Sequence, residues 1–515
     1  MASDSETTPL VRVHSTLVDE LPSRRIRIIQ VVCAMTWCLF AAGPIFGFAA
    51  LKPVLISEGV YKDLCPVDVL SSSDICVERD LKLNFMFTLA AVVTNATAFI
   101  VGRVLDTYGP RITGIVGSFV IFGGAVLLAS GSRITLFDSY LSGYVTMAFG
   151  GPFVFISCFQ LANSFPGHSG LVLALLTGSF DTSSALFMFY RVIYQNNYVK
   201  NLSLNKFFTA YLIVPVFILV CQLTIMPKNS YKTVETLARI GKTGIDETGL
   251  PVDSEDSRYD PQEVNELERT RSHLSIRSSK SVFEEIADKQ LNDKSGGVHG
   301  VLHGKQVKEQ LKTPWFYLMC LFTTIQMLRI NYFLATIRSQ MTWYFDSELT
   351  AIKINKLFDI ALPLGGVLSI PFIGLILDNL KTLTTLHILL IVSALIGLAG
   401  MTSSIFLQVA GICVLVLYRP FYYTAVSDYC AKVFGFETFG TVYGTIICFS
   451  GICNLLQSYL DKLTHFSFHM DPNPVNGLLL GLTILFGGSM LGYVKGQERK
   501  IKRQAIISEA LAGAE

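Results

Sequence analysis

Long apolar runs recur along this 515-residue sequence and constrain its fold more than any other feature. Each holds about the 20 residues that an α-helix needs to cross a lipid bilayer. Hydrophobic residues make up 51% of the chain and charged residues only 16%, a balance that argues against a soluble globular protein. We therefore expect an all-α membrane protein of twelve transmembrane helices. The runs cover residues 28–56, 83–105, 112–129, 140–163, 170–194, 207–225, 315–337, 356–377, 386–405, 409–433, 439–460 and 477–494.

A break in composition divides the runs into two sets of six. Residues 228–311 are charged and serine-rich, so we expect a cytosolic, largely disordered central loop there. It would separate a first bundle at 28–227 from a second at 312–494. The tails at 1–27 and 495–515 both carry basic residues next to a run. Because positively charged flanks stay in the cytosol, we expect both termini on that side.

One short motif stands at matching places in the two sets of runs, each time where an apolar run ends. Its residues are Gly102, Asp106, Gly109 and Arg111 in the first copy, and Gly374 and Asp378 in the second. Glycine lets two helices approach closely, and an aspartate can accept hydrogen bonds from the exposed amides at a helix start. The repetition predicts a duplicated unit with a gating turn at the cytoplasmic end of each half.

The alternation of the runs places two further features outside the cytosol. Cys65 and Cys76 lie in the loop after the first run and are candidates for a disulfide bond, the alternative being two free thiols. Asn201 begins an Asn-Leu-Ser sequence in another outer loop, which makes it a glycosylation acceptor.

Four ionisable residues inside the runs stand out, because each costs roughly 2.5–3.5 kcal/mol at a helix centre on insertion scales. Asp181 stands beside Ser183 and Ser184. The others are Arg329, beside Asn331 and Tyr332, then Asp359 and Arg419. One interpretation is a polar solute site in which an arginine holds a carboxylate or ring carbonyl and Asp181 holds an amine, a ring N–H or a proton. The other is a fixed strut between helices.

Glycine and aromatic residues near these positions extend the candidate site. Gly43 and Gly47 flank Pro44 in the first run, where they can free backbone groups for a ligand or simply allow close packing. Phe48 and Tyr422 are candidates for an aromatic wall of the site, or for lipid-facing residues.

The repeated motif resembles the G-x-x-x-D-x-x-G-x-[R/K] signature of the major facilitator superfamily, with Lys381 replacing the second glycine in the second copy. The stretches GPIFGF, YKDLC, LTGSFDTSSALF, YRPFYYTA and ETFGTVYG are similar to solute carrier family 43. That family holds sodium-independent large neutral amino-acid transporters and an equilibrative nucleobase transporter. The resemblance implies two six-helix bundles with a solute site near the midplane between them. FDTSSA looks closer to the nucleobase branch, because the amino-acid members have small residues in place of Asp181. The overall style suggests a fungal relative.

No pattern for a catalytic site, a metal site or a cofactor stands out, so we expect a transporter and not an enzyme. The resemblance implies movement of a small polar solute by alternating access, most simply neutral amino acids without sodium. A nucleobase facilitator and a non-transporting nutrient sensor are the alternatives. Residues Glu6 to Val11 approximate an acidic dileucine signal, which predicts a sorting adaptor as partner and a vacuolar membrane as location.

Overall fold

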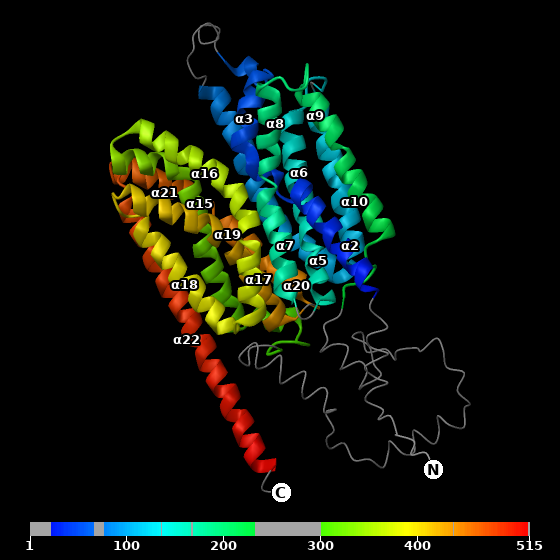
Figure 1. Ribbon diagram of the computed structural model, residues 1–515, viewed down its shortest axis with the longest axis vertical. Coiled ribbons are helices and arrows are strands. Elements are labelled where there is room, and N and C mark those ends of the chain that lie inside the picture. Colours follow the sequence, from blue (N-terminus) through cyan, green and yellow to red (C-terminus); the bar gives the residue numbers. More distant parts are fainter. Residues whose placement is uncertain are drawn as a thin grey trace, which may run out of the picture.

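The computed structural model describes residues 22–65, 77–134, 136–165, 168–231, 300–435 and 437–512. Regular secondary structure within these ranges is helical throughout, and the helices lie side by side in a long bundle (Figure 1). Large apolar side chains face outward from it, among them Phe119, Phe372 and Leu375, each more than 60% exposed. A surface of this kind suits lipid, which confirms the expected all-α membrane protein.

The first transmembrane segment is broken near its middle, as its glycines and proline predict. Helix α2 (Arg24–Trp37) continues into a π-helical turn η1 (Cys38–Ala42), and a 3-10 turn η2 (Pro44–Gly47) leads into α3 (Phe48–Ser57). Gly43 joins the two turns with φ −138° and ψ 23°, which is not helical. The break divides this segment in two.

Helices of the N-terminal half, residues 22–231, follow in chain order. They are η3 (Lys62–Leu64), α5 (Val77–Ala129), α6 (Ser139–Ile156), η4 (Phe159–Ser164), α7 (Ser169–Thr182), α8 (Ala185–Gln195), α9 (Leu204–Tyr211) and α10 (Ile213–Thr224). Gly109 divides the 53-residue α5 at φ 80° and ψ 173°, with Pro110 directly after it. Positive φ is readily adopted only by glycine, so this motif residue makes a turn that other side chains would strain.

The C-terminal half, residues 300–512, is also built of consecutive helices. Its helices are α14 (Val307–Gln310), α15 (Pro314–Phe345), α16 (Glu348–Leu368), α17 (Ile370–Asn379), α18 (Thr382–Ala399), α19 (Ile405–Phe434), α20 (Phe439–Cys453), α21 (Leu456–Lys462), η6 (Leu463–Ser467) and α22 (Asn473–Ala512). The end of α22 extends past the rest of the bundle (Figure 1).

Among the described residues, ten helices are long and apolar enough to cross a membrane, or eleven if the bent pair α16 and α17 counts as one span. One of the ten, Lys82–Ala129, has 48 residues, about twice the length of a single crossing. Several predicted boundaries differ from the structure. At one of them, the run expected to end at Ile405 ends at Ala399, and Ile405 begins α19. Residues 400–404, with the sequence Gly-Met-Thr-Ser-Ser, separate the two helices.

Glycines bring helices of the two halves into direct backbone contact. A Cβ on Gly102 of α5 would lie 1.9 Å from the carbonyl oxygen of Gly440 on α20. A Cβ on Gly178 of α7 would lie 2.5 Å from the carbonyl oxygen of Gly366 on α16. Small residues permit such close crossings between membrane helices. These crossings fix the halves against each other around the residues described next.

Candidate functional site

Asp181 and Arg419 meet at the boundary between the two halves. Asp181 lies on α7 and Arg419 on α19, each near the middle of its membrane-crossing segment. Nη1 of Arg419 is 3.6 Å from Oδ1 of Asp181, and both residues are about 95% buried or more. The sequence grouped these two charges into one candidate solute site or strut, and the structure places them together.

This ion pair is not fully hydrogen-bonded. Neither carboxylate oxygen of Asp181 has a hydrogen-bond partner among the described residues, and neither does Nε of Arg419. Charge-assisted N–H···O bonds usually measure about 2.7–2.9 Å, shorter than the 3.6 Å found here. Buried charged groups that lack partners carry a desolvation penalty, so the pair retains capacity for further hydrogen bonds.

Aromatic rings surround the pair. The guanidinium carbon of Arg419 lies 6.0 Å from the ring centre of Phe46 on η2, within the range of a cation–π contact. Phe46 meets Phe180 edge-on at 5.9 Å, and Phe180 stacks on Phe155 at 4.5 Å. Tyr423, one turn after Arg419 on α19, lies close enough to interact electrostatically with both charges. Sequence reasoning missed Phe46, although its position between Pro44 and Gly47 at the helix break was a usable signal.

Gly43 and Gly47 pack against the junction between α7 and α8. A Cβ on Gly43 would lie 2.8 Å from Oγ of Ser183, and one on Gly47 would lie 2.3 Å from the carbonyl oxygen of Ser184. The hydroxyl groups of these serines donate to backbone carbonyls, Ser183 to Phe180 at 2.5 Å and Ser184 to Asp181 at 3.0 Å. In this state the four residues shape the site by close packing, and their predicted contact with solute stays a prediction.

The other predicted site residues lie apart from this ion pair. Phe48 stacks on Phe87 at 5.4 Å inside the N-terminal half, and Tyr422 donates to the carbonyl of Thr323 at 2.8 Å inside the C-terminal half. Tyr332 pairs with Thr464 at 2.7 Å, Asn331 beside it on α15 is partly buried, and Arg329 donates to Ser393. Asp359 is exposed and accepts from Asn355 at 3.2 Å.

The two motif aspartates each hold a helix start of the opposite half. Asp106 accepts from the amides of Gly440 and Thr441 at 3.0 and 2.7 Å, and from the Thr441 hydroxyl at 2.6 Å. Asp378 accepts from the amides of Gly170 and Leu171 at 2.7 and 3.2 Å. A carboxylate at a helix N-terminus satisfies unpaired amides and meets the positive end of the helix dipole. We call these two contacts the latches, and the end of the bundle where they lie the latch end.

The remaining motif residues support the latches. Gly102 permits the approach of Gly440, and Gly374 lies against Leu171, where a Cβ would be 3.1 Å from its Cα. Arg111 donates from Nε to the carbonyl of Met226 at 3.1 Å. The arginine therefore joins the start of one helix to the end of α10 within its own half.

Comparison with known proteins identifies the chain's relatives. No family model matches it. It is 53% identical over 491 residues to Protein FMP42 of Saccharomyces cerevisiae, covering 92% of this chain and 96% of that protein. The fold matches the major facilitator superfamily proton:xylose symporter XylE with a TM-score of 0.59 at 12% identity, covering 92% of this chain and 96% of that one. The chain belongs to the same family as FMP42 and has the fold of the major facilitator superfamily.

Within the superfamily, this transporter is related to solute carrier family 43. It is 23% identical over 491 residues to equilibrative nucleobase transporter 1 of Bos taurus, covering 89% of this chain and 94% of that protein. It is 28% identical over 169 residues to the human large neutral amino acids transporter small subunit 3, covering 30% of each. The family expected from the sequence is confirmed: the protein is a multi-pass membrane transporter of a small solute and not an enzyme.

At the end of this transporter opposite the latches, predicted modifications fall partly outside the described residues. Cys65 is disulfide-bonded, but Cys76 lies outside them, so the pairing of these two stays a prediction. Asn201 is exposed in the turn between α8 and α9, where it is accessible for glycosylation. The N-terminal sorting signal and nearly all of the central loop also lie outside the described residues.

Proposed function

We propose that this transporter moves neutral amino acids independently of sodium, and that the zwitterion binds between Asp181 and Arg419. The observation that most supports this proposal is the buried ion pair, which has one residue from each half and is incompletely hydrogen-bonded. Solute sites in transporters built from such repeats lie near the midplane, where the two halves meet. Binding there links the solute directly to the relative position of the halves.

Hydrogen bonding favours a solute site over a permanent strut. A strut gains most from a bidentate arginine–carboxylate pair at about 2.7–2.9 Å. Arg419 and Asp181 instead stand 3.6 Å apart and leave both carboxylate oxygens and one guanidinium nitrogen without a hydrogen bond. An arrangement that binds nothing keeps that desolvation cost, whereas a ligand with matching groups removes it.

A zwitterion matches the two charges in sign and number. Its carboxylate can accept two parallel N–H bonds from the planar guanidinium of Arg419. Its ammonium group can donate to the carboxylate of Asp181. The ion pair between Asp181 and Arg419 is thereby replaced by two ion pairs with the ligand. The site with its bound solute has no net charge while the solute crosses the membrane. Phe46, Phe180 and Tyr423 can then contact a large apolar side chain.

A nucleobase is the second candidate, favoured by the match to a nucleobase transporter over 89% of this chain. A flat base has ring N–H groups for Asp181 and carbonyl oxygens for Arg419, and its faces can stack on the same aromatic rings. A base carries no full charge, so when it is bound the charges of Asp181 and Arg419 still have to neutralise each other. Measuring whether amino acids or nucleobases bind therefore separates these two candidates.

Thermal unfolding of the purified protein tests the proposal against a panel of leucine, phenylalanine, arginine, adenine and uracil. We expect leucine or phenylalanine to raise the unfolding temperature, and excess unlabelled compound to block uptake of the labelled form by proteoliposomes. Replacing sodium with potassium should leave that uptake unchanged. Stabilisation by adenine alone would assign the second candidate. Binding without flux would instead identify a sensor.

Alternating access gives the latches their role. We place the latch end in the cytosol, with both termini and the central loop on that side, because basic residues flank the first and last helices there. Counting Lys82–Ala129 as two crossings gives the broken first segment and eleven others, which is a twelve-helix topology. In the described state the latches join the halves at the cytosolic end, and transport requires them to separate.

We further propose a vacuolar membrane as the location, addressed by a sorting adaptor that reads Glu6 to Val11. A fluorescent fusion of the Glu6→Ala, Leu10→Ala double variant should move to another membrane. An unchanged location would remove this part of the proposal without affecting the transport assignment.

A further inference from the structure

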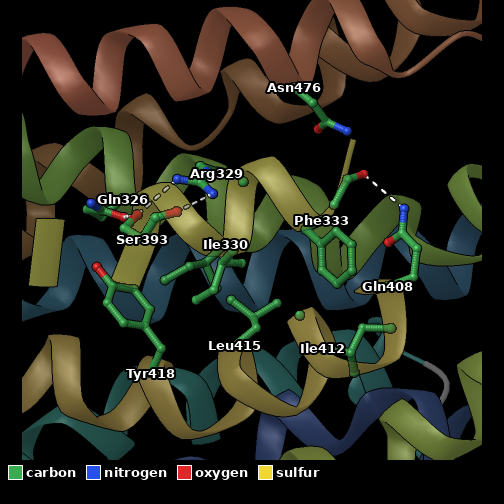
Figure 2. Close-up of a pocket in the computed structure, with 14 residues that line it drawn as sticks. Gln326, Arg329, Ile330, Phe333, Ser393, Gln408, Ile412, Leu415, Tyr418 and Asn476 are labelled. Atoms are coloured by element: carbon green, nitrogen blue, oxygen red, sulfur yellow. Dashed lines mark hydrogen bonds between the residues drawn. The ribbon is translucent and has the colours of Figure 1, made fainter. Parts of the chain in front are cut away.

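A polar cavity lies within the C-terminal half, lined by residues of α15, α18, α19 and the start of α22 (Figure 2). It measures about 50 Å³. Its polar end is formed by Gln326, Arg329, Ser393 and Tyr418, and the rest of its wall is largely apolar, with Ile330 and Leu415 in the centre of the view. The proposed amino-acid site does not use it, because Asp181 and Arg419 are absent from its lining.

Three hydrogen bonds arrange the polar end. Arg329 donates from Nη1 to the Ser393 hydroxyl at 2.9 Å and from Nη2 to the Ser393 carbonyl at 2.7 Å. The Ser393 hydroxyl in turn donates to Oε1 of Gln326 at 2.8 Å. The serine hydroxyl thus accepts one bond and gives its only proton away, and the glutamine oxygen accepts that proton with one of its two lone pairs.

The groups left over at this end are donors. Nε2 of Gln326 has no hydrogen-bond partner among the described residues, although only 1% of that residue is exposed. The same holds for the hydroxyl of Tyr418, which is 3% exposed. Arg329 uses two of its five N–H groups on Ser393, and its guanidinium has no acceptor capacity. All of these groups can donate, and only the Tyr418 hydroxyl can also accept, so a ligand with acceptor atoms satisfies them best.

The charge of Arg329 points to the same kind of ligand. Arginine stays protonated in proteins. None of the ion pairs between described residues includes Arg329. An isolated positive charge near the centre of a membrane helix is costly, and an anion beside it offsets that cost. Because Arg329 lies near the middle of α15, a lipid phosphate at the surface stands about half a bilayer away, roughly 15 Å.

We propose that this cavity binds a small monovalent anion, a halide or a short carboxylate, on Arg329, Gln326 and Tyr418. Tyr418 and Arg419 are neighbours on α19, and successive side chains of a helix point about 100° apart. Tyr418 therefore faces this cavity while Arg419 faces the N-terminal half. Gly397 keeps the space for the guanidinium, since a Cβ there would lie 2.5 Å from Nη2 of Arg329.

Titration of the purified full-length protein with sodium chloride and with sodium acetate tests the assignment, using thermal unfolding and calorimetry at constant ionic strength set with sodium gluconate. We expect saturable stabilisation by chloride, acetate or both, and which salt acts identifies the ligand. Arg329→Gln should abolish the response. Arg338→Gln removes an exposed arginine of the same helix and should leave it intact, which controls for general salt effects. Arg419→Gln should also retain it, which separates this cavity from the proposed amino-acid site.

Tyr418→Phe keeps the proposal testable if Arg329→Gln does not fold, because it removes a single hydroxyl and keeps the ring. We expect it to raise the anion Kd about ten-fold, as loss of one hydrogen bond to a charged group does. Gly397→Ala should weaken binding by displacing the guanidinium while all charges remain. The proposal is overturned if neither salt gives a saturable response, or if the response is unchanged in Tyr418→Phe and Gly397→Ala.

Discussion

Removing the Asp106 latch should slow transport while leaving solute affinity nearly intact. Asp106 accepts three hydrogen bonds from Gly440 and Thr441 across the boundary between the halves. A hydrogen bond to a charged group contributes about 1.5–3 kcal/mol, and the contributions of one carboxylate are not additive. We take the value of one such bond as the minimum loss in Asp106→Ala. The loss falls on the latched state, since only there do these groups meet.

That free energy changes the ratio of latched to unlatched protein about ten- to a hundred-fold. From a starting ratio of about 100:1, the latched fraction falls from nearly all to between roughly nine-tenths and one half. If the latched state is the one that binds solute, apparent affinity therefore falls at most about two-fold. The same free energy is lost from the step that re-forms the latched state, so where that step limits the cycle, transport slows by up to about ten- to a hundred-fold.

Uptake by proteoliposomes gives the rate, and titration of the unfolding temperature with the solute found in the panel gives the affinity. Thr441→Val removes one of the three contacts and should produce a smaller loss of rate than Asp106→Ala. Asp378→Ala, which removes two contacts, should resemble Asp106→Ala. A large loss of affinity in stably folded Asp106→Ala would refute the reasoning, because it would place the aspartate in contact with the solute.

Three further predictions concern a disulfide bond, a close glycine contact and a glycosylation site. Mass spectrometry of protein from native membranes should find Cys65 and Cys76 joined by a disulfide, and detection of both as free thiols would exclude the pairing. Gly47→Ala should lower the unfolding temperature, because its Cβ would lie 2.3 Å from the Ser184 carbonyl oxygen, whereas Gly123→Ala, with open space around it, should not. Asn201→Gln should remove a glycan seen as a mobility shift, and an unshifted wild-type band would show that the site is unused.

Features that depend on a single stretch of the chain could be predicted from local sequence patterns. The break of the first segment followed from Gly43 and Pro44, and the motif aspartates followed from their place at the end of an apolar run. Each latch partner lies on a helix of the other half, more than 200 residues away, so no local pattern could name Gly440 or Gly170. The latches required the fold.

Ionisable residues inside apolar runs show the same limit more sharply. Asp181, Arg329 and Arg419 all signalled a buried polar environment, and the sequence grouped them into one site. Which helix face each occupies decides its neighbours, and a rotation of about 100° between adjacent residues separates Tyr418 from Arg419. Arg329 instead meets Ser393, an unremarkable serine of the ninth apolar run, in a cavity of its own.

The central claim, a solute site at the meeting point of Asp181 and Arg419, is tested most directly by Arg419→Gln. The measurement is solute binding by the purified variant, followed as thermal stabilisation, with its unfolding temperature in the absence of solute as the control. We expect a folded protein whose affinity for the solute of the wild type is about ten- to a hundred-fold lower, as loss of a charge-assisted contact of roughly 1.5–3 kcal/mol implies. A strut would instead show as unfolding of both single variants and partial rescue by exchanging the two charges. Normal binding and normal transport by Arg419→Gln would contradict the assignment.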